Sequence, residues 1–208
     1  MKKSLVALAL FTTLASSTVM AKDVKRISKT MDVEQGQKIS LNVPVGSLDV
    51  QTCDCNEITI KVTVEPSNNK WGFFSSGADV DNAELKIRER SSGLSFEIDE
   101  DDTKQKWKVT LPASSALDID MGVGSVDVED LSNSLNAEVG VGQISVDLSG
   151  DNYQRIELES GVGDTSIDGF SGVKTKRSVV SSEASFRGDG EYSISIEVGV
   201  GSADVDLN

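Results

Sequence analysis

Apolar and polar residues alternate with a period of two along most of this chain. Beyond residue 21, no stretch keeps the three- and four-residue apolar spacing of an amphipathic helix over three turns. Alternation of this kind is typical of β-strands with one buried face. The pattern therefore predicts an all-β fold with almost no helix.

Four of the alternating segments are copies of one repeat, each broken in its middle by Gly-Val-Gly. The copies are Leu117-Asp-Ile-Asp-Met-Gly-Val-Gly-Ser-Val-Asp-Val128, Leu135-Asn-Ala-Glu-Val-Gly-Val-Gly-Gln-Ile-Ser-Val146, Ile156-Glu-Leu-Glu-Ser-Gly-Val-Gly-Asp-Thr-Ser-Ile167 and Ile194-Ser-Ile-Glu-Val-Gly-Val-Gly-Ser-Ala-Asp-Val205. Successive copies are 18, 21 and 38 residues apart, and 38 is two steps of 19. We expect a degenerate copy midway in the last step, over residues 182–188, and an upstream relative over residues 45–50.

A unit of about 19 residues cannot bury its own apolar face and must stack on its neighbours. We expect a β-solenoid of such rungs, with parallel strands in register. An antiparallel β-sandwich is the alternative, because the period does not set strand direction. The side chains expected to point inward after the glycines are Val126, Val128, Ile144, Val146, Leu148, Thr165, Ile167, Ala184, Phe186, Ala203, Val205 and Leu207. Residues 113–208 hold the regular repeats, and residues 33–112 are expected to form irregular rungs with an insertion loop near 67–82.

The first 21 residues read as a secretory signal peptide. A charged start at Lys2 and Lys3 precedes a short apolar run, and Ala21 ends a small-residue cleavage site. The run is too short to span a bilayer, and no later segment reaches the length that a membrane helix needs. We expect one exported domain over residues 22–208, located in the periplasm or, alternatively, secreted or at the cell surface.

The composition and the net charge exclude several kinds of catalysis and argue against nucleic-acid binding. The 208 residues include 34 acidic and 20 basic side chains and no histidine, which gives a formal net charge of -14. Without histidine, Ser-His-Asp catalysis, Cys-His catalysis and His-based zinc sites are excluded. The acidic surplus repels nucleic-acid phosphates, and it is concentrated in residues 109–208, with 18 acids against 5 bases. We therefore expect an envelope protein or a basic surface as the partner, and no nucleic acid.

One outward-facing position of the stacked repeats carries charge in each copy. It is occupied by Glu129, Asp147, Asp168, Arg187 and Asp206. Stacked strands lie about 4.8 Å apart, so this column would bring like charges together. The column is a candidate face for a cation or a basic partner. Alternatively, Arg187 relieves the repulsion within an ordinary solvated surface.

Cys53 and Cys55 are the two cysteines of the chain. In an exported protein, an intramolecular disulfide would have to join them. This requires a tight turn, because residues two apart in a strand are near the limit of disulfide reach. Two other interpretations stay open: free or intermolecularly paired thiols, and a redox or metal-binding pair.

Two aromatic groups differ in their expected roles. Trp71, Phe73 and Phe74 lie in the polar insertion loop, where they could anchor a partner or cap an open end of the stack. Trp107 shares a strand face with Val109 and is expected in the core. The lysines that alternate with them, Lys104, Lys106 and Lys108, form a basic strand face. They could pair with the acidic half of a neighbouring molecule or, equally, guard a sheet edge.

Paired carboxylates raise the question of catalysis. Asp118 with Asp120, and Glu157 with Glu159, have a same-face spacing that a glycosidase acid and base could use. Such pairs recur with the repeat, whereas a catalytic pair is unique. The acidic stretch over residues 99–102 is expected to be a solvated loop rather than a metal site. We therefore expect no enzymatic activity, no bound metal and no cofactor.

Short motifs connect the chain to a known family. The Gly-Val-Gly repeats, the upstream Leu41-Asn-Val-Pro-Val-Gly-Ser-Leu-Asp-Val50 and the pair Leu111-Pro112 resemble the bacterial putative-adhesin β-strand-repeat family, a domain of unknown function. The resemblance extends from about Val33 to Leu207. It implies a right-handed β-helical or β-solenoid domain of the bacterial envelope without known catalytic residues, and some related domains occur in envelope-stress systems.

The sequence and this resemblance together lead to an expected function. We expect a non-enzymatic exported protein that presents an acidic surface for protein binding or adhesion. The alternative is a structural or stress-associated envelope component without a high-affinity ligand.

Overall fold

The computed structural model describes residues 24–67 and 80–208. The predicted signal peptide and the loop residues Trp71, Phe73 and Phe74 lie outside these ranges. The strands are β1 (Lys25–Asp32), β2 (Ile39–Cys53), β3 (Glu57–Pro66), β4 (Lys86–Arg90), β5 (Gly93–Glu97), β6 (Thr103–Pro112), β7 (Leu117–Leu131), β8 (Leu135–Leu148), β9 (Tyr153–Asp168), β10 (Lys174–Arg177), β11 (Ser182–Arg187) and β12 (Tyr192–Leu207). Helical structure in the described ranges amounts to one 3-10 turn, η1 (Val80–Asn82). The all-β prediction is therefore confirmed.

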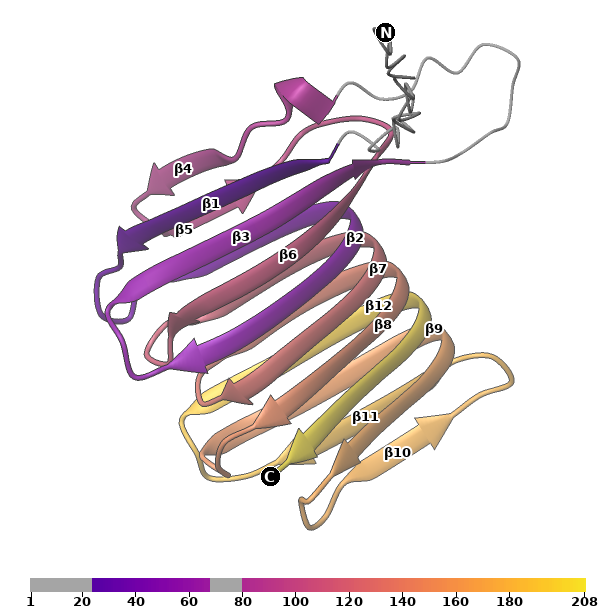
Figure 1. Cartoon of the computed structure of the whole chain (residues 1–208). Coiled ribbons are helices and arrows are strands. Elements are labelled where there is room, and N and C mark those ends of the chain that lie inside the picture. Colours follow the sequence, from indigo (N-terminus) through magenta and orange to yellow (C-terminus); the bar gives the residue numbers. More distant parts are fainter. Residues whose placement is uncertain (1–23, 68–79) are drawn as a thin grey trace, which may run out of the picture.

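Five long strands, β2, β7, β8, β9 and β12, are bent near their middle and stacked one behind another (Figure 1). The bend falls at Gly-Val-Gly or, in β2, at Pro44-Val45-Gly46. We call the half before the bend the first arm and the half after it the second arm. Apolar side chains alternate inward along both arms and form one core cluster, and every side chain that was expected to point inward is buried or partly buried.

The five bent strands pair in parallel and in register, glycine opposite glycine at the bends. Their spatial order is β2-β7-β8-β12-β9, so the last repeat lies between the second and third regular repeats rather than at the end. Close stacking makes glycine necessary at the bend. A Cβ on Gly142, whose φ is +150°, would lie 1.7 Å from the carbonyl oxygen of Gly124.

At the N-terminal end of the stack, two separate strands take the place of a bent strand, and antiparallel strands extend the sheet further. β5 pairs in parallel with the first arm of β2 and β6 with its second arm, and the loop over residues 98–102 takes the place of the bend. β3 and β1 then extend the sheet beyond β6 in antiparallel fashion, and β4 extends it beyond β5. Trp107 of β6 is fully buried, as expected, and its Nε1 donates a hydrogen bond of 2.9 Å to Oε1 of Gln105.

Of the two interpretations of the β6 lysines, the guarded sheet edge is wrong, because β6 lies between β2 and β3. Its inward side chains fill the core, and its outward lysines form ion pairs with neighbouring strands. Lys106 Nζ is 3.0 Å from Glu65 Oε1, and Lys108 Nζ is 3.3 Å from Asp49 Oδ2. The strands that end the sheet path, β1 and β10, and the outer strand β4 carry lysines and arginines of their own.

Aromatic side chains close the other end of the stack. The rings of Phe170 and Phe186 have centroids 4.5 Å apart, and Tyr153 makes edge contacts with Phe170 and Tyr192. The Tyr153 hydroxyl donates a hydrogen bond of 2.9 Å to the carbonyl oxygen of Leu131. Burial raises the pKa of this phenol. These residues cap the core where no further rung follows.

The weak repeat copy over residues 182–188 belongs to this cap. It forms β11, which pairs antiparallel with the first arm of β9 and with β10. Its expected equivalence with the second arms of the regular repeats is therefore wrong. A short turn joins β10 to β11, and only antiparallel neighbours can be joined so directly.

Candidate binding surface

An unbroken row of acidic side chains crosses the outer face of the first arms. Its members are, in spatial order, Asp120 on β7, Glu138 on β8, Glu197 on β12, Glu159 on β9 and Glu183 on β11. Each member lies directly opposite the next in the strand register, at a strand spacing of about 4.8 Å. All five side chains are exposed. We call this row the acidic ladder.

Alternation along each first arm explains why the ladder points outward. Glu138, for example, is followed by Val139, which is buried in the core, so the carboxylate must face solvent. An acidic residue occupies this position in all four regular repeats. The sequence contained this signal, but the acidic column was expected after the glycines, and the ladder lies before them.

Among the described residues, one ladder member, at one end of the row, forms an ion pair. Lys176 Nζ is 2.9 Å from Glu183 Oε1. At the other end, the Asn42 amide donates a hydrogen bond of 3.5 Å to the carboxylate of Asp120. Within residues 24–67 and 80–208, the three central members, Glu138, Glu197 and Glu159, form no ion pair. These three carboxylates therefore face one another without a paired cation among the described residues.

A second polar row, which includes Ser40, Asp118 and Asn136, runs beside the ladder on the same arms. Asp118 accepts hydrogen bonds from Ser40 and Asn136, at 3.2 and 3.0 Å, and pairs with Lys38 at 3.2 Å. Partial burial alone would raise the pKa of Asp118, but the hydrogen bonds and the Lys38 charge outweigh burial and lower it. These groups line a shallow groove of about 430 Å³ that also reaches ladder residues.

Three of the five charged residues expected in one column do lie in one. Asp206 of β12 lies between Asp147 of β8 and Asp168 of β9 on the outer face of the second arms. Partial burial and the charges of its neighbours Asp168 and Asp147 raise the pKa of Asp206. Partial burial, with Asp49 and Asp147 nearby, likewise raises the pKa of Asp127. Like charges are therefore crowded on this face as well.

Of the other two residues expected in that column, Glu129 lies at a bulge and Arg187 lies elsewhere. The register of β7 against β8 shifts between Val128 and Leu131, so Glu129 lies at a bulge, although it lines the same groove as Asp147. On the other side of β7, Glu129 pairs with Gln51 of β2. Arg187 lies on β11 opposite Arg155, on the side of the first arms. The expected equivalence of Arg187 with Asp147, Asp168 and Asp206 is wrong, because β11 runs in the reverse direction and pairs with the first arm of β9. At Glu129 the bulge interrupts the regular pairing of the column.

The carboxylate pairs that raised the question of catalysis belong to the two rows of the first arms. Their second members, Asp120 and Glu159, are ladder residues. The first members differ in their surroundings: Asp118 is held by Asn136, Ser40 and Lys38, whereas Glu157 lies 3.6 Å from the guanidinium groups of both Arg155 and Arg187. Among the described residues, no group of three or more His, Cys, Asp or Glu side chains could hold a metal ion.

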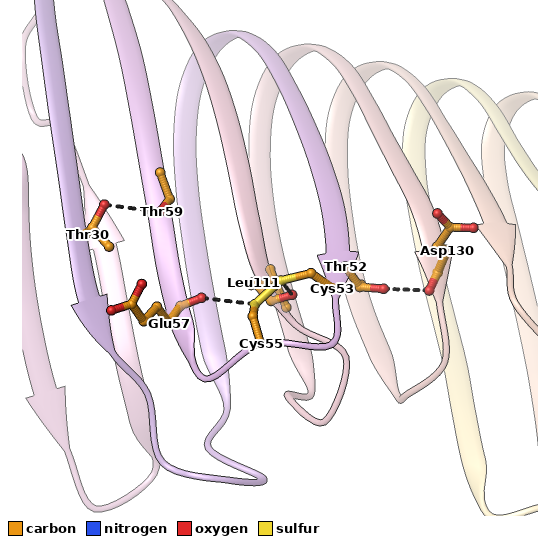
Figure 2. The surroundings of a disulfide bond; sticks show 8 residues. All are labelled: Thr30, Thr52, Cys53, Cys55, Glu57, Thr59, Leu111 and Asp130. Atoms are coloured by element: carbon orange, nitrogen blue, oxygen red, sulfur yellow. Dashed lines mark hydrogen bonds between the residues drawn. A yellow bond between two sulfur atoms is a disulfide. The ribbon is translucent and has the colours of Figure 1, made fainter.

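Cys53 and Cys55 are joined by a disulfide, with their Cα atoms 5.3 Å apart (Figure 2). The bond lies where β2 ends and the chain bends over residues 54–56 before β3. Next to it, the Thr52 hydroxyl donates a hydrogen bond of 2.6 Å to the carbonyl oxygen of Asp130. The disulfide therefore closes the turn that follows the second arm of β2, away from the bends.

The sequence and the fold were compared with those of known proteins. No helix of the described residues is long and apolar enough to cross a bilayer. A search of curated proteins finds no match. Among solved structures, a "putative cell adhesion protein" of Clostridium sporogenes is similar, with 16% identity, coverage of 88% of this chain and 100% of that chain, and a TM-score of 0.54. This likeness concerns the fold alone.

A "putative adhesin" of Parabacteroides distasonis also matches, with 14% identity, coverage of 88% of this chain and 71% of that chain, and a TM-score of 0.30. The family comparison is more specific. Residues 16–168, well over half of the chain, match the N-terminal domain of toast_rack, DUF2154. The expectation of an adhesin-like family of unknown function is confirmed. The chain belongs to the toast_rack N-terminal domain family.

Proposed function

We propose that this protein is a non-enzymatic, exported protein of the bacterial envelope that binds a basic face of a partner protein through its acidic ladder. The observation that carries the proposal is the placement of Glu138, Glu197 and Glu159, three exposed carboxylates in register that form no ion pair within residues 24–67 and 80–208. Like charges directly opposite each other destabilise a sheet. A row that is unfavourable for the free protein becomes favourable when a partner supplies the compensating charge.

The rest of the proposal concerns architecture and location. The bent strands act as rungs of a solenoid-like stack, which holds the carboxylates in one rigid line. The signal peptide over residues 1–21 exports a single domain over residues 22–208 to the periplasm or the cell surface. The fold likeness to a protein described as a cell adhesion protein supports an adhesion-like role. The recurrence of carboxylates along the stack supports binding over catalysis, since a catalytic pair would be unique.

A capture experiment with matched variants tests this function. The exported chain is immobilised and exposed to envelope extract of the source bacterium. The ladder variant E138Q/E159Q/E197Q is compared with D151N/D189N/E191Q, which removes three exposed acids outside the ladder and changes net charge equally. We expect a saturable partner that the control variant retains and the ladder variant loses.

A third variant, D147N/D168N/D206N, tests the column on the second arms. Loss of the partner with this variant alone would move the binding face to the second arms and contradict the ladder. Equal retention by all variants would contradict acid-mediated binding altogether.

A further inference from the structure

A line of exposed valines runs along the bends of the stack. We call it the valine ridge, and it consists of Val45, Val123, Val141, Val200 and Val162, in this spatial order. Each lies opposite the next in register, so the ridge is about 19 Å long at the usual strand spacing. Their relative exposures are between 40% and 48%.

The fold does not need valine at these positions. The bend depends on the flanking glycines, whose close backbone contacts leave no room for a Cβ. The valine side chains point to solvent instead, where a serine or threonine would fit the same backbone. An apolar residue at the same exposed position of all five strands therefore calls for an explanation outside the core.

The ridge also contains most of the large hydrophobic residues that are exposed in the described part of the chain. Eight large hydrophobic residues are exposed in the described part of the chain, and five of them form the ridge. Two more, Val179 and Val180, lie in the turn whose Val180 carbonyl accepts a hydrogen bond of 2.9 Å from Gly163, next to ridge residue Val162. Contiguous exposed apolar surface of this kind marks interaction sites in soluble proteins.

The ridge and the acidic ladder are built from the same strands. In each regular repeat, the ladder acid precedes the ridge valine by three residues, as Glu138 precedes Val141 and Glu197 precedes Val200. Two parallel stripes result, one anionic and one apolar. The ridge valines Val141 and Val200 also border a groove of about 690 Å³. Its lining consists of glycines, of the neutral side chains of Ser47, Ser125, Gln143 and Ser202, and of the charged side chains of Lys104, Lys106 and Asp164.

Charge complementarity selects one class of occupant for this pair of stripes. A second copy of the chain would bring a further net charge of -14 against the same edge, and an anionic lipid surface would be repelled by the ladder. A segment with an apolar face flanked by lysines or arginines fits both stripes at once. An α-helix repeats its faces every 5.4 Å, close to the strand spacing of about 4.8 Å.

We propose that the valine ridge and the acidic ladder together bind a basic amphipathic segment of the partner protein, with its apolar face on the valines and its cationic flank on the carboxylates. This inference rests on the proposed function and specifies the chemistry of the partner. The ridge supplies burial of apolar surface, and the ladder fixes the orientation of the segment along the stack.

A defined peptide tests the inference. The probe is a helix-forming peptide of leucine and lysine, about 18 residues and so roughly 27 Å long, with its lysines along one flank of the leucine face. Its binding to the exported chain is measured by calorimetry. The comparison peptides are a scrambled sequence of the same composition and one with glutamate in place of lysine.

Three variants locate the binding: V123S/V141S/V200S on the ridge, E138Q/E159Q/E197Q on the ladder, and D151N/D189N/E191Q as the control of equal charge. We expect the ridge and ladder variants each to weaken binding of the amphipathic peptide at least tenfold, and the control to bind like the wild type. The scrambled peptide should bind at least tenfold more weakly. Thermal melting confirms that each variant is folded.

The other outcomes overturn the inference in distinguishable ways. If only the ladder variant loses the peptide, the proposed function stands and the ridge has no part in it. If the ridge variant abolishes self-association of the wild type, or its binding to zwitterionic lipid vesicles, while peptide binding is unchanged, the occupant is a second copy or a membrane surface. If all variants bind equally, peptide binding is non-specific and the inference fails, whereas the capture experiment still decides the proposed function.

Discussion

Glu138 and Glu197 lie directly opposite each other on the parallel strands β8 and β12, although 58 residues separate them in the chain. Neither forms an ion pair with a described residue. Like charges opposed in a sheet destabilise it by roughly 0.2–1 kcal/mol per pair. We expect E197Q to raise the free energy of unfolding by roughly 0.4–2 kcal/mol, because it relieves repulsion with two ladder neighbours, Glu138 and Glu159.

Denaturant unfolding at low and high salt measures this effect. The gain from E197Q should shrink as salt rises, since exposed charges are screened within about 10 Å at 0.1 M salt. A gain that is independent of salt, or a loss of stability, would show that repulsion along the ladder is not what the substitution removes.

Asp206 provides a prediction for pH. Because burial and neighbouring carboxylates raise its pKa in the folded state, the folded protein holds this proton more tightly than the unfolded chain. The stability contributed by this residue is therefore present below its unfolded pKa and is lost as the pH rises through the folded pKa. D206N should be more stable than the wild type at pH 7 and equal to it at about pH 3.

The pKa of Asp118 is shifted in the opposite direction, so this residue serves as the control for Asp206. Hydrogen bonds and Lys38 lower its pKa, so its contribution is present above the unfolded pKa and is lost as the pH falls through the folded pKa. D118N should lose stability at pH 7, and this loss should shrink toward acid pH. Melting curves across this range would contradict the assignment if both variants shifted in the same direction.

Gly142 tests the close stacking of the bends. G142A would place a Cβ 1.7 Å from the backbone of Gly124, on a residue with φ +150°. Gly150 has φ +131° but no atom within 4 Å of such a Cβ. We expect G142A to destabilise the protein by at least about 3 kcal/mol, and G150A to cost about 1–3 kcal/mol from backbone strain alone. Equal losses in denaturant unfolding would mean that stacking at the bend is looser than described.

Val141 and Val139 separate surface from core within one strand. Val139 is 1% exposed and Val141 is 48% exposed. V139S should destabilise the protein by about 2–4 kcal/mol, because it removes buried apolar surface and buries a hydroxyl. V141S should change stability by no more than about 0.5 kcal/mol. A large loss with V141S in thermal melting would give the ridge a structural role and remove the case for a binding role.

Much of the fold could be predicted from the repeat. Alternation and the Gly-Val-Gly spacing identified the strands, the bends and the inward residues, because burial on one face imposes a period of two. The spatial order of the strands was not predictable from the period, since any two such strands can pair in register. One feature of the sequence did mark β9 as the last of the five bent strands. It carries polar residues at the inward positions Ser160 and Thr165, and the Thr165 hydroxyl forms a hydrogen bond of 2.8 Å with the Ser182 hydroxyl of the cap.

The candidate site was predicted less well than the fold. Asp147, Asp168 and Asp206 share a column because their repeats align without insertion. Arg187 does not, because the reversal of chain direction at β11 leaves no mark on the spacing, and the bulge next to Glu129 was equally unpredictable. The ladder and the ridge were readable at fixed positions of the repeat, but their alignment across strands depends on parallel pairing.

The most direct test of the binding account is carboxylate labelling of the exported chain, with and without the partner recovered by capture. Exposed carboxylates are coupled to an amine with a carbodiimide, and the labelled residues are identified by mass spectrometry. We predict that Glu138, Glu197 and Glu159 lose labelling when the partner is bound, while Asp147 and Asp206 keep theirs. Protection of the second-arm aspartates instead, or unchanged labelling of the ladder, would contradict the account.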